Sequence, residues 1–276
     1  MNEMNKIGLI SAMFILVSAT MQMMAQSVSV SPSRLYFKEL PGGFKSQKIR
    51  VTNNGTKSET FQLGFNDFAS DGNKGKTQIV KGEDNLRGCS RWLSASPSFF
   101  ELAPGVTQDV EILMQVPNTP EAKNARWAVA AVKLAREKTG SGEKGSDVTG
   151  MQILQTFQFL IHIFQTPPTV TYKEANVLSF TRLSTSQDSV QVLSMEVENA
   201  GETILDCAPY LDVVNLNTGE SKRIRNRAFS VLPEGRRAIR FTLPGDLAKG
   251  KYSILGVIDY GSDSDLAGAE LTIDIE

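Results

Sequence analysis

Apolar and polar residues alternate with a period of two along most of the chain after residue 26. Near the beginning, Val28 and Val30 alternate with serines, and Leu35 and Phe37 repeat the spacing. Farther on, the dipeptide Asn54-Gly55 separates two apolar runs, an arrangement typical of a β-hairpin. Because successive side chains of a strand point to opposite faces, this period predicts β-strands, and the period of a helix is nearly absent.

Turn-forming residues separate the alternating runs. Pro104-Gly105 stands between two runs of the first half, and the second half repeats the style in "VQVLSMEVENAGE" and "GKYSILGVIDYG". Between the halves, Pro167 and Pro168 cannot continue a strand ladder and mark a domain junction. Short strands separated by regular turns are typical of β-sandwiches. The sequence therefore predicts an all-β protein with two immunoglobulin-like β-sandwich domains in tandem, at residues 26–166 and 167–276.

The first 25 residues have a different pattern. Lys6 precedes a mostly apolar run from Ile7 to Ala19, and Ala25 offers a small residue for cleavage before Gln26. This order is typical of a secretory signal peptide, and the run is too short for a permanent transmembrane helix. We expect residues 1–25 to be removed, the mature chain to reside in the periplasm, and no stable membrane insertion.

Composition and charge exclude several classes of partner. Hydrophobic residues make up 41% of the chain, which is ordinary for a folded protein, and the formal net charge is −1. A charge so close to zero steers the protein neither to nucleic acid nor to an anionic membrane. We therefore expect no nucleic-acid partner.

The two cysteines, Cys89 and Cys207, fall one in each predicted domain. In an oxidising compartment they could form a disulfide across the two domains, or each could be a separate buried thiol. Their spacing fits no metal site, and the chain has one histidine, so the sequence predicts neither a bound metal nor a cofactor. It also contains no nucleophile elbow, zinc-binding His-Glu-x-x-His pair or glycine-rich phosphate loop, which predicts a protein that is not an enzyme.

The segment "MQILQTFQFLIHIFQTPP", residues 151–168, carries the most informative pattern. It is too short for a membrane span and holds several polar side chains, each costly in hydrocarbon. One face of the predicted strand is almost entirely apolar and comprises Met151, Ile153, Phe157, Phe159, Ile161 and Ile163, with Gln155 as the exception. The other face mixes glutamines and Thr156 with Leu154, Leu160, His162 and Phe164.

Three interpretations of this strand remain open. Its apolar face can pack entirely into the core of its own sandwich. Part of the apolar row can instead be exposed and complete the unfinished sheet of another protein, or make an ordered contact with a different fixed partner. Since both faces carry bulky apolar side chains, and soluble proteins rarely leave such rows bare, we expect something outside this core to cover one of them.

Three stretches of the first predicted domain resemble the periplasmic pilus-assembly chaperones of the PapD type. "VSPSRLYF" is similar to that family's first strand, with Arg34 at its arginine, and "FELAPGVTQDVEI" is similar to its Leu-x-Pro-Gly turn and following strand. "LQTFQFLIHIFQTPP" is similar to the last strand of its first domain. The second predicted domain matches only in being a sandwich.

The resemblance implies a function in which this last strand is donated to a client. A pilus or surface subunit lacking one strand would pair with it by β-augmentation, and Ile153, Phe157, Phe159 and Ile161 would fill the client's pockets. Arg34 would hold the client's terminal carboxylate. An outer-membrane usher would be a further partner.

The sequence departs from the family at one anchoring position. The family has a lysine that grips the client's carboxylate with the arginine, whereas this chain has His162. A histidine of ordinary pKa is only about one quarter protonated at pH 7, so the second positive charge is in question. The alternative function is therefore a permanent, non-enzymatic structural or adhesive component of a cell-envelope assembly.

Overall fold

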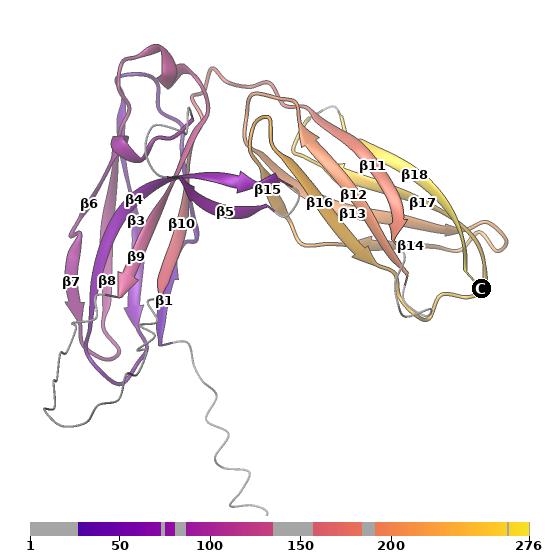
Figure 1. The fold of residues 1–276 in the computed structure, drawn as a ribbon, viewed down its shortest axis with the longest axis horizontal. Coiled ribbons are helices and arrows are strands. Elements are labelled where there is room, and N and C mark those ends of the chain that lie inside the picture. Colours follow the sequence, from indigo (N-terminus) through magenta and orange to yellow (C-terminus); the bar gives the residue numbers. More distant parts are fainter. Residues whose placement is uncertain are drawn as a thin grey trace, which may run out of the picture.

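A computed structural model describes residues 27–72, 75–80, 87–134, 157–183, 191–263 and 265–275. The predicted signal peptide and Ile153 lie outside these residues. The described residues form two β-sandwiches that meet at an angle (Figure 1). This architecture confirms the predicted all-β fold of two sandwiches in tandem.

The first sandwich consists of two sheets. One has the order β1-β3-β8-β6 and is built from β1 (Val28–Ser31), β3 (Phe44–Asn53), β8 (Thr107–Gln115) and β6 (Leu93–Ser96). The other has the order β2-β10-β9-β4-β5 and is built from β2 (Arg34–Phe37), β10 (Gln158–Gln165), β9 (Arg126–Leu134), β4 (Glu59–Asp71) and β5 (Lys76–Val80). A short strand, β7 (Phe99–Leu102), pairs with β4, and two 3₁₀ turns, η2 (Ser90–Trp92) and η3 (Pro120–Lys123), lie in the connections.

The second sandwich also has two sheets. The smaller one has the order β11-β12-β16, from β11 (Ala175–Leu183), β12 (Val192–Asn199) and β16 (Arg236–Thr242). The larger one has the order β14-β13-β17-β18, from β14 (Ser221–Arg225), β13 (Leu205–Asn215), β17 (Gly250–Asp259) and β18 (Ala267–Ile275), and β15 (Phe229–Val231) pairs with β13. Within the described residues, no helix has the length and apolar character that crossing a bilayer requires.

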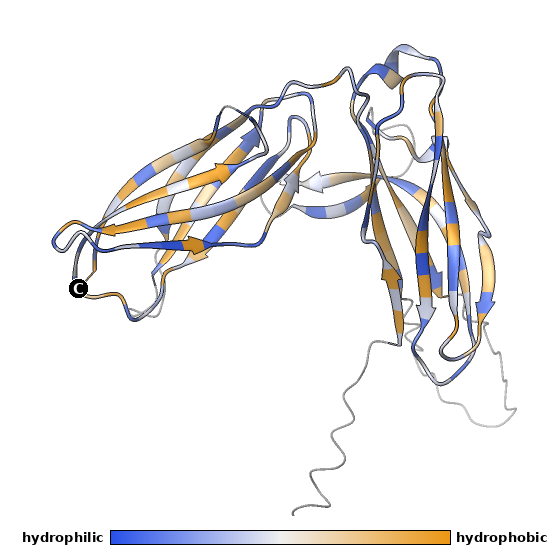
Figure 2. Ribbon diagram, turned by 180° about the vertical axis from the view of Figure 1, so that it is seen from behind, coloured by the Kyte–Doolittle hydropathy of each residue, from blue (hydrophilic) through white to orange (hydrophobic). Residues whose placement is uncertain are grey.

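Each sandwich has its own apolar core. Figure 2 shows hydrophobic and hydrophilic residues alternating along the strands, as the period of two predicts. The core of the first sandwich draws on residues between Val28 and Ile163, and that of the second on residues between Ala175 and Ile273. Cys89 is buried in the first core and Cys207 in the second, and both thiols are free. The structure thus favours the alternative of two separate buried thiols.

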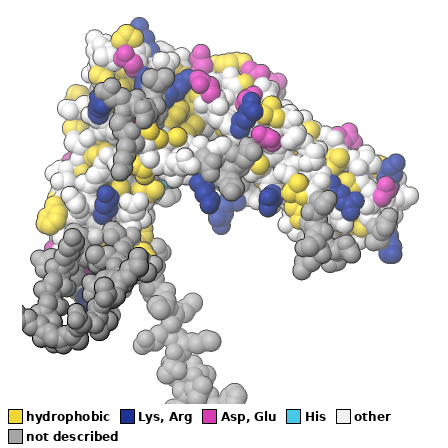
Figure 3. Space-filling model, in the orientation of Figure 1, with side chains coloured by type: hydrophobic (Ala, Val, Ile, Leu, Met, Phe, Trp, Pro, Cys, Tyr) yellow, Lys and Arg dark blue, Asp and Glu magenta, His cyan; other side chains and the backbone are white. Residues whose placement is uncertain are grey.

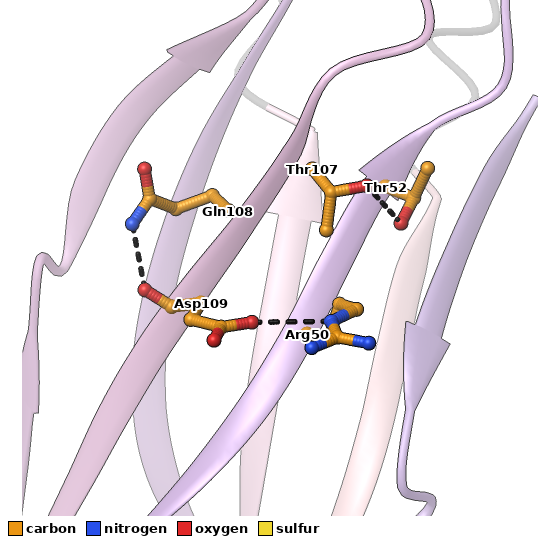
Figure 4. A network of polar contacts seen from close by, with 5 residues as sticks. All are labelled: Arg50, Thr52, Thr107, Gln108 and Asp109. Atoms are coloured by element: carbon orange, nitrogen blue, oxygen red, sulfur yellow. Dashed lines mark hydrogen bonds and ion pairs between the residues drawn. The ribbon is translucent and has the colours of Figure 1, made fainter.

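The outward face of the β3–β8 sheet is polar. Arg50 and Asp109 lie opposite each other in the register of these strands and form an ion pair of 3.1 Å between Nε and Oδ1. Thr52 and Thr107, the next outward pair, join their hydroxyl groups at 2.9 Å (Figure 4). Such exposed cross-strand pairs are compatible with a face directed to water. Apolar surface that a partner could cover therefore lies on other parts of this domain.

The first strand is divided between the two sheets. β1 pairs antiparallel with β3, and after Pro32, which has no N–H to donate, the chain crosses over and β2 pairs parallel with β10. The pairing of β2 with β10 covers only residues His162–Gln165. The first half of β10 is therefore paired with β9 alone among the described strands.

A hairpin reaches from the first sandwich to the second. The last residues of β4, from Asp67 to Asp71, leave the sheet and pair with β5. Figure 1 shows this β4–β5 hairpin extending across the angle between the sandwiches. Near its tip, Gly75 has a φ of +60° and approaches Arg237 so closely that a Cβ there would overlap the guanidinium. The hairpin therefore touches the second domain at Gly75, a position whose positive φ favours glycine.

Candidate functional site

The apolar row that runs from Phe157, just before β10, to Ile163 changes from exposed to buried along its length. Ile161 and Ile163 are sealed in the core of the first sandwich, with 1% and 0% of their surface exposed. Phe159 is only partly buried against that core, and Phe157 remains 50% exposed. Ile161 belongs to the predicted donor row but packs between the two sheets. The exposed part of that row within the described residues is thus reduced to Phe157 and part of Phe159.

Among the described residues, no strand pairs with the outer edge of the first half of β10. The His162 N–H donates a hydrogen bond of 3.1 Å to the Ser33 carbonyl oxygen on the β2 side, and the Leu134 N–H on β9 donates to the Phe157 carbonyl oxygen. Since alternate residues of a strand direct their backbone groups to opposite sides, Gln158 and Leu160 point toward the open edge. This edge is a site to which a further strand could be added.

Arg34 and His162, the two predicted anchoring residues, lie side by side. They are register partners on the parallel strands β2 and β10. Arg34 Nη1 is 3.6 Å from Oδ1 of Asp206, which the second domain contributes from β13. The structure thus brings the two predicted residues together at the angle between the domains, where a carboxylate of the chain itself already faces Arg34.

His162 is held in a partly buried environment. Its Nε2 is 2.7 Å from the Thr77 hydroxyl of the β4–β5 hairpin, and the ring of Phe68 meets it edge-on with centroids 5.2 Å apart. Burial lowers the pKa of His162, and the positive charge of Arg34 lowers it further. Both effects favour the neutral form of the imidazole.

An apolar cluster joins the two domains beside this site. Phe164, Phe68 and Trp127 from the first sandwich pack with Leu232 from the second. The Trp127 indole N–H donates a hydrogen bond of 2.9 Å to the Phe68 carbonyl oxygen. Next to the cluster, Arg87 pairs with Glu234 across the junction. The mixed face of β10 is thus covered partly by the second domain.

A hollow lies next to the anchoring residues. It has a volume of about 990 Å³ and extends between the end of β2, the connection after β10 and the second domain. Tyr36, Phe164 and Asp206 contribute to its wall, together with Pro167. Space is therefore available on one side of the Asp206 carboxylate.

Sequence reasoning missed the residues that complete this site. Asp206 and Thr77 are unremarkable in the sequence, and they meet Arg34 and His162 only because the second domain and the hairpin fold over β10. Within the described ranges, no group of three or more His, Cys, Asp or Glu side chains is placed to hold a metal ion.

Comparisons with known proteins give structural similarity without detectable sequence similarity. No protein-family model matches the sequence, and no curated protein matches it. Among solved structures, the Escherichia coli chaperone DraB has 14% identity and a TM-score of 0.42, with 89% of this chain and 98% of DraB covered. The CupB2 chaperone of Pseudomonas aeruginosa has 13% identity and a TM-score of 0.41, with the same coverage.

A third structure is the complex of the chaperone CsuC with the tip subunit CsuE from Acinetobacter baumannii. It matches with 11% identity and a TM-score of 0.43 over 88% of this chain and 98% of that chain. The chain is thus similar to fimbrial chaperones over most of its length, at identities that leave its function to be inferred from its own residues.

Proposed function

We propose that the chain is a non-enzymatic periplasmic chaperone that binds a pilus or surface subunit through the first half of β10. The observation that supports this most is the combination of a free backbone edge with the exposed Phe157 in one short stretch. A client strand added to this edge would gain main-chain hydrogen bonds from Gln158 and Leu160. Phe157 and the exposed part of Phe159 would then enter apolar pockets of the client.

The anchoring residues fit the same role. Arg34 lies one strand away from the open edge and is partly exposed, so its guanidinium could receive a carboxylate at the end of the client strand. His162 would contribute to this site as a neutral hydrogen-bonding group, because its pKa is lowered. Ile153, which precedes the described part of the strand, would extend the apolar row. An usher would be a later partner.

The test is co-purification of a client from periplasmic extract with matched phenylalanine variants. Phe157→Asp should abolish recovery of a small β-rich subunit that lacks a strand, while the chaperone itself stays folded. Phe99→Asp is the control, since Phe99 is 65% exposed on β7 of the same sandwich, away from β10. The proposal is wrong if both variants retain the subunit, or if both lose it equally. Stable, stoichiometric recovery without release to an assembled fibre would instead favour a permanent structural component.

A further inference from the structure

Positive charge in the second domain is concentrated in one segment of the chain. Residues 222–240 contain seven Lys and Arg residues and a single acidic residue, Glu234. The other residues from 167 to 276 contain four Lys and Arg residues and 15 Asp and Glu residues. The net charge of −1 of the whole chain therefore conceals a strongly basic segment in an otherwise acidic domain.

This segment forms one edge of the second sandwich. β14 is the end strand of the larger sheet and β16 is an end strand of the smaller one, among the strands that the structure describes. Asn226 joins them, because its N–H donates a hydrogen bond of 3.0 Å to the Pro209 carbonyl oxygen and its side-chain amide donates one of 2.7 Å to the Arg240 carbonyl oxygen. Arg225 and Arg227, which flank Asn226, thereby lie beside Arg240 of the other sheet.

The basic residues of this edge differ in whether a carboxylate neutralises them. Arg223 binds Asp212 through Nε and Nη2, at 2.6 and 2.7 Å, and Arg236 binds Glu198 at 2.9 Å. Within the described ranges, no carboxylate lies within ion-pair distance of three further exposed arginines, which we call the edge arginines: Arg225, Arg227 and Arg240.

The nearest compensation for an edge arginine is shared. The hydrogen bond from Arg223 lowers the pKa of the Asp212 carboxyl, and the charge of Arg225 lowers it further. One carboxylate thus faces two guanidinium groups, and the bidentate contact goes to Arg223. The edge arginines therefore carry an excess of positive charge, which attracts an anionic partner.

Protection of strand edges explains only part of this charge. Positive side chains on an end strand hinder pairing with the sheet of another molecule, and Arg225 on β14 and Arg240 on β16 are placed to do so. Arg227 lies between β14 and β15 and belongs to neither strand. Its charge protects no strand edge, so a contact with a partner accounts for the three arginines together better than protection does.

The basic edge borders the angle between the two sandwiches. The β4–β5 hairpin, which extends across this angle, meets β10 where the Thr77 hydroxyl lies 2.7 Å from His162 Nε2, and it meets β16 where Gly75 lies against the Arg237 guanidinium. Figure 1 shows β10 on the side of the first sandwich that is turned toward the second. Figure 3 shows Lys and Arg side chains on the concave side of the bend. A protein bound at β10 would therefore lie next to the basic edge.

We propose that the edge arginines form a cationic surface that contacts an acidic face of the client while the client is bound at β10. This inference rests on the proposed function and adds the second domain to it. The partner is a surface rich in Asp and Glu, because guanidinium groups bind carboxylates well and the edge carries excess positive charge. Exposed ion pairs contribute little to affinity, so the surface would mainly speed association and orient the client.

The test measures whether the intact mature chain prefers an acidic peptide. The probe is a fluorescent octapeptide of alternating Glu and Ser, compared with the same peptide carrying Gln in place of Glu. In anisotropy titrations at about 20 mM salt, the wild type should bind the Glu peptide about tenfold more tightly, the effect of a few exposed ion pairs. At about 300 mM salt the preference should largely disappear, because these charges are exposed and screened.

Two triple variants identify the residues responsible. The edge variant, Arg225→Gln, Arg227→Gln and Arg240→Gln, should lose the preference for the Glu peptide, and replacing the same three residues by Lys should keep most of it. The control variant removes the same charge from exposed positions of the first sandwich: Lys45→Gln, Lys48→Gln and Lys57→Gln. It should keep the wild-type preference.

Three results would overturn the inference. The first is an edge variant that keeps the full preference for the Glu peptide, and the second is a control variant that loses the preference equally. The third is a wild type that binds vesicles containing phosphatidylglycerol but shows no preference for the Glu peptide, which would make the basic edge a lipid-binding surface.

Phe157→Asp separates this inference from the proposed function in the co-purification of the subunit. If Phe157→Asp loses the subunit and the wild type shows no preference for the Glu peptide, strand donation stands and the cationic surface fails. If Phe157→Asp retains the subunit, the edge variant loses it and the preference is present, the cationic surface stands and strand donation fails. If Phe157→Asp retains the subunit and the preference is absent, both proposals fail.

Discussion

The two ends of the apolar row that runs from Phe157 into β10 have the same alternation of side chains but opposite environments. Ile163 lies where β10 is flanked by both β9 and β2, and Ile161 directly precedes that stretch; both side chains are buried. Phe157 lies where β9 is the sole described neighbour, and half of its surface is exposed. The difference shows that the apolar period alone does not tell which part of one row is core and which part is exposed.

The largest expected effect that tests this comparison is the loss of unfolding free energy when Ile163 or Phe157 is truncated. Ile163→Ala creates a cavity in a fully closed core and should reduce the free energy of unfolding by about 2–5 kcal/mol. Phe157→Ala removes a side chain that is half in water and should cost clearly less, about 1–2 kcal/mol. Urea unfolding followed by tryptophan fluorescence measures both. Equal losses would mean that Phe157 belongs to the core.

A smaller expected effect concerns how the stability of the folded chain around His162 on β10 depends on pH. The folded-state pKa of His162 lies below the ordinary value near 6.5, so the unfolded chain binds the proton first as pH falls. Stability that depends on neutral His162 is therefore complete above about pH 7 and is lost as pH falls through the unfolded pKa. His162→Gln, which can still hydrogen-bond Thr77, should flatten the decrease in unfolding midpoint between about pH 7.5 and 5. An unchanged slope would show that His162 is not the responsible group.

The fold was predictable because its signals are local. Alternation identified strands, Asn54-Gly55 and Pro104-Gly105 identified turns, and the adjacency of Arg34 and His162 followed from the resemblance of two strands. These features depend on a few neighbouring residues. They do not require knowledge of how the domains pack.

The candidate site was only partly predictable because its remaining parts depend on tertiary packing. Ile161 and Phe157 have the same position in the alternation, yet Ile161 is buried in the core and Phe157 is half exposed. Asp206 reaches the site from the second domain, and Thr77 reaches it on a hairpin that leaves its own sheet. The spacing of these residues in the sequence does not indicate these tertiary contacts.

The open edge of β10 is tested most directly by amide hydrogen exchange, residue by residue, in the free chain and in the complex with its co-purified subunit. The amides of Gln158 and Leu160 point away from β9 and should exchange quickly in the free chain, whereas those of Phe159 and Ile161 should be protected. In the complex, Gln158 and Leu160 should become protected as well. Protection of all four amides in the free chain, or rapid exchange of Gln158 and Leu160 in the complex, would contradict strand donation.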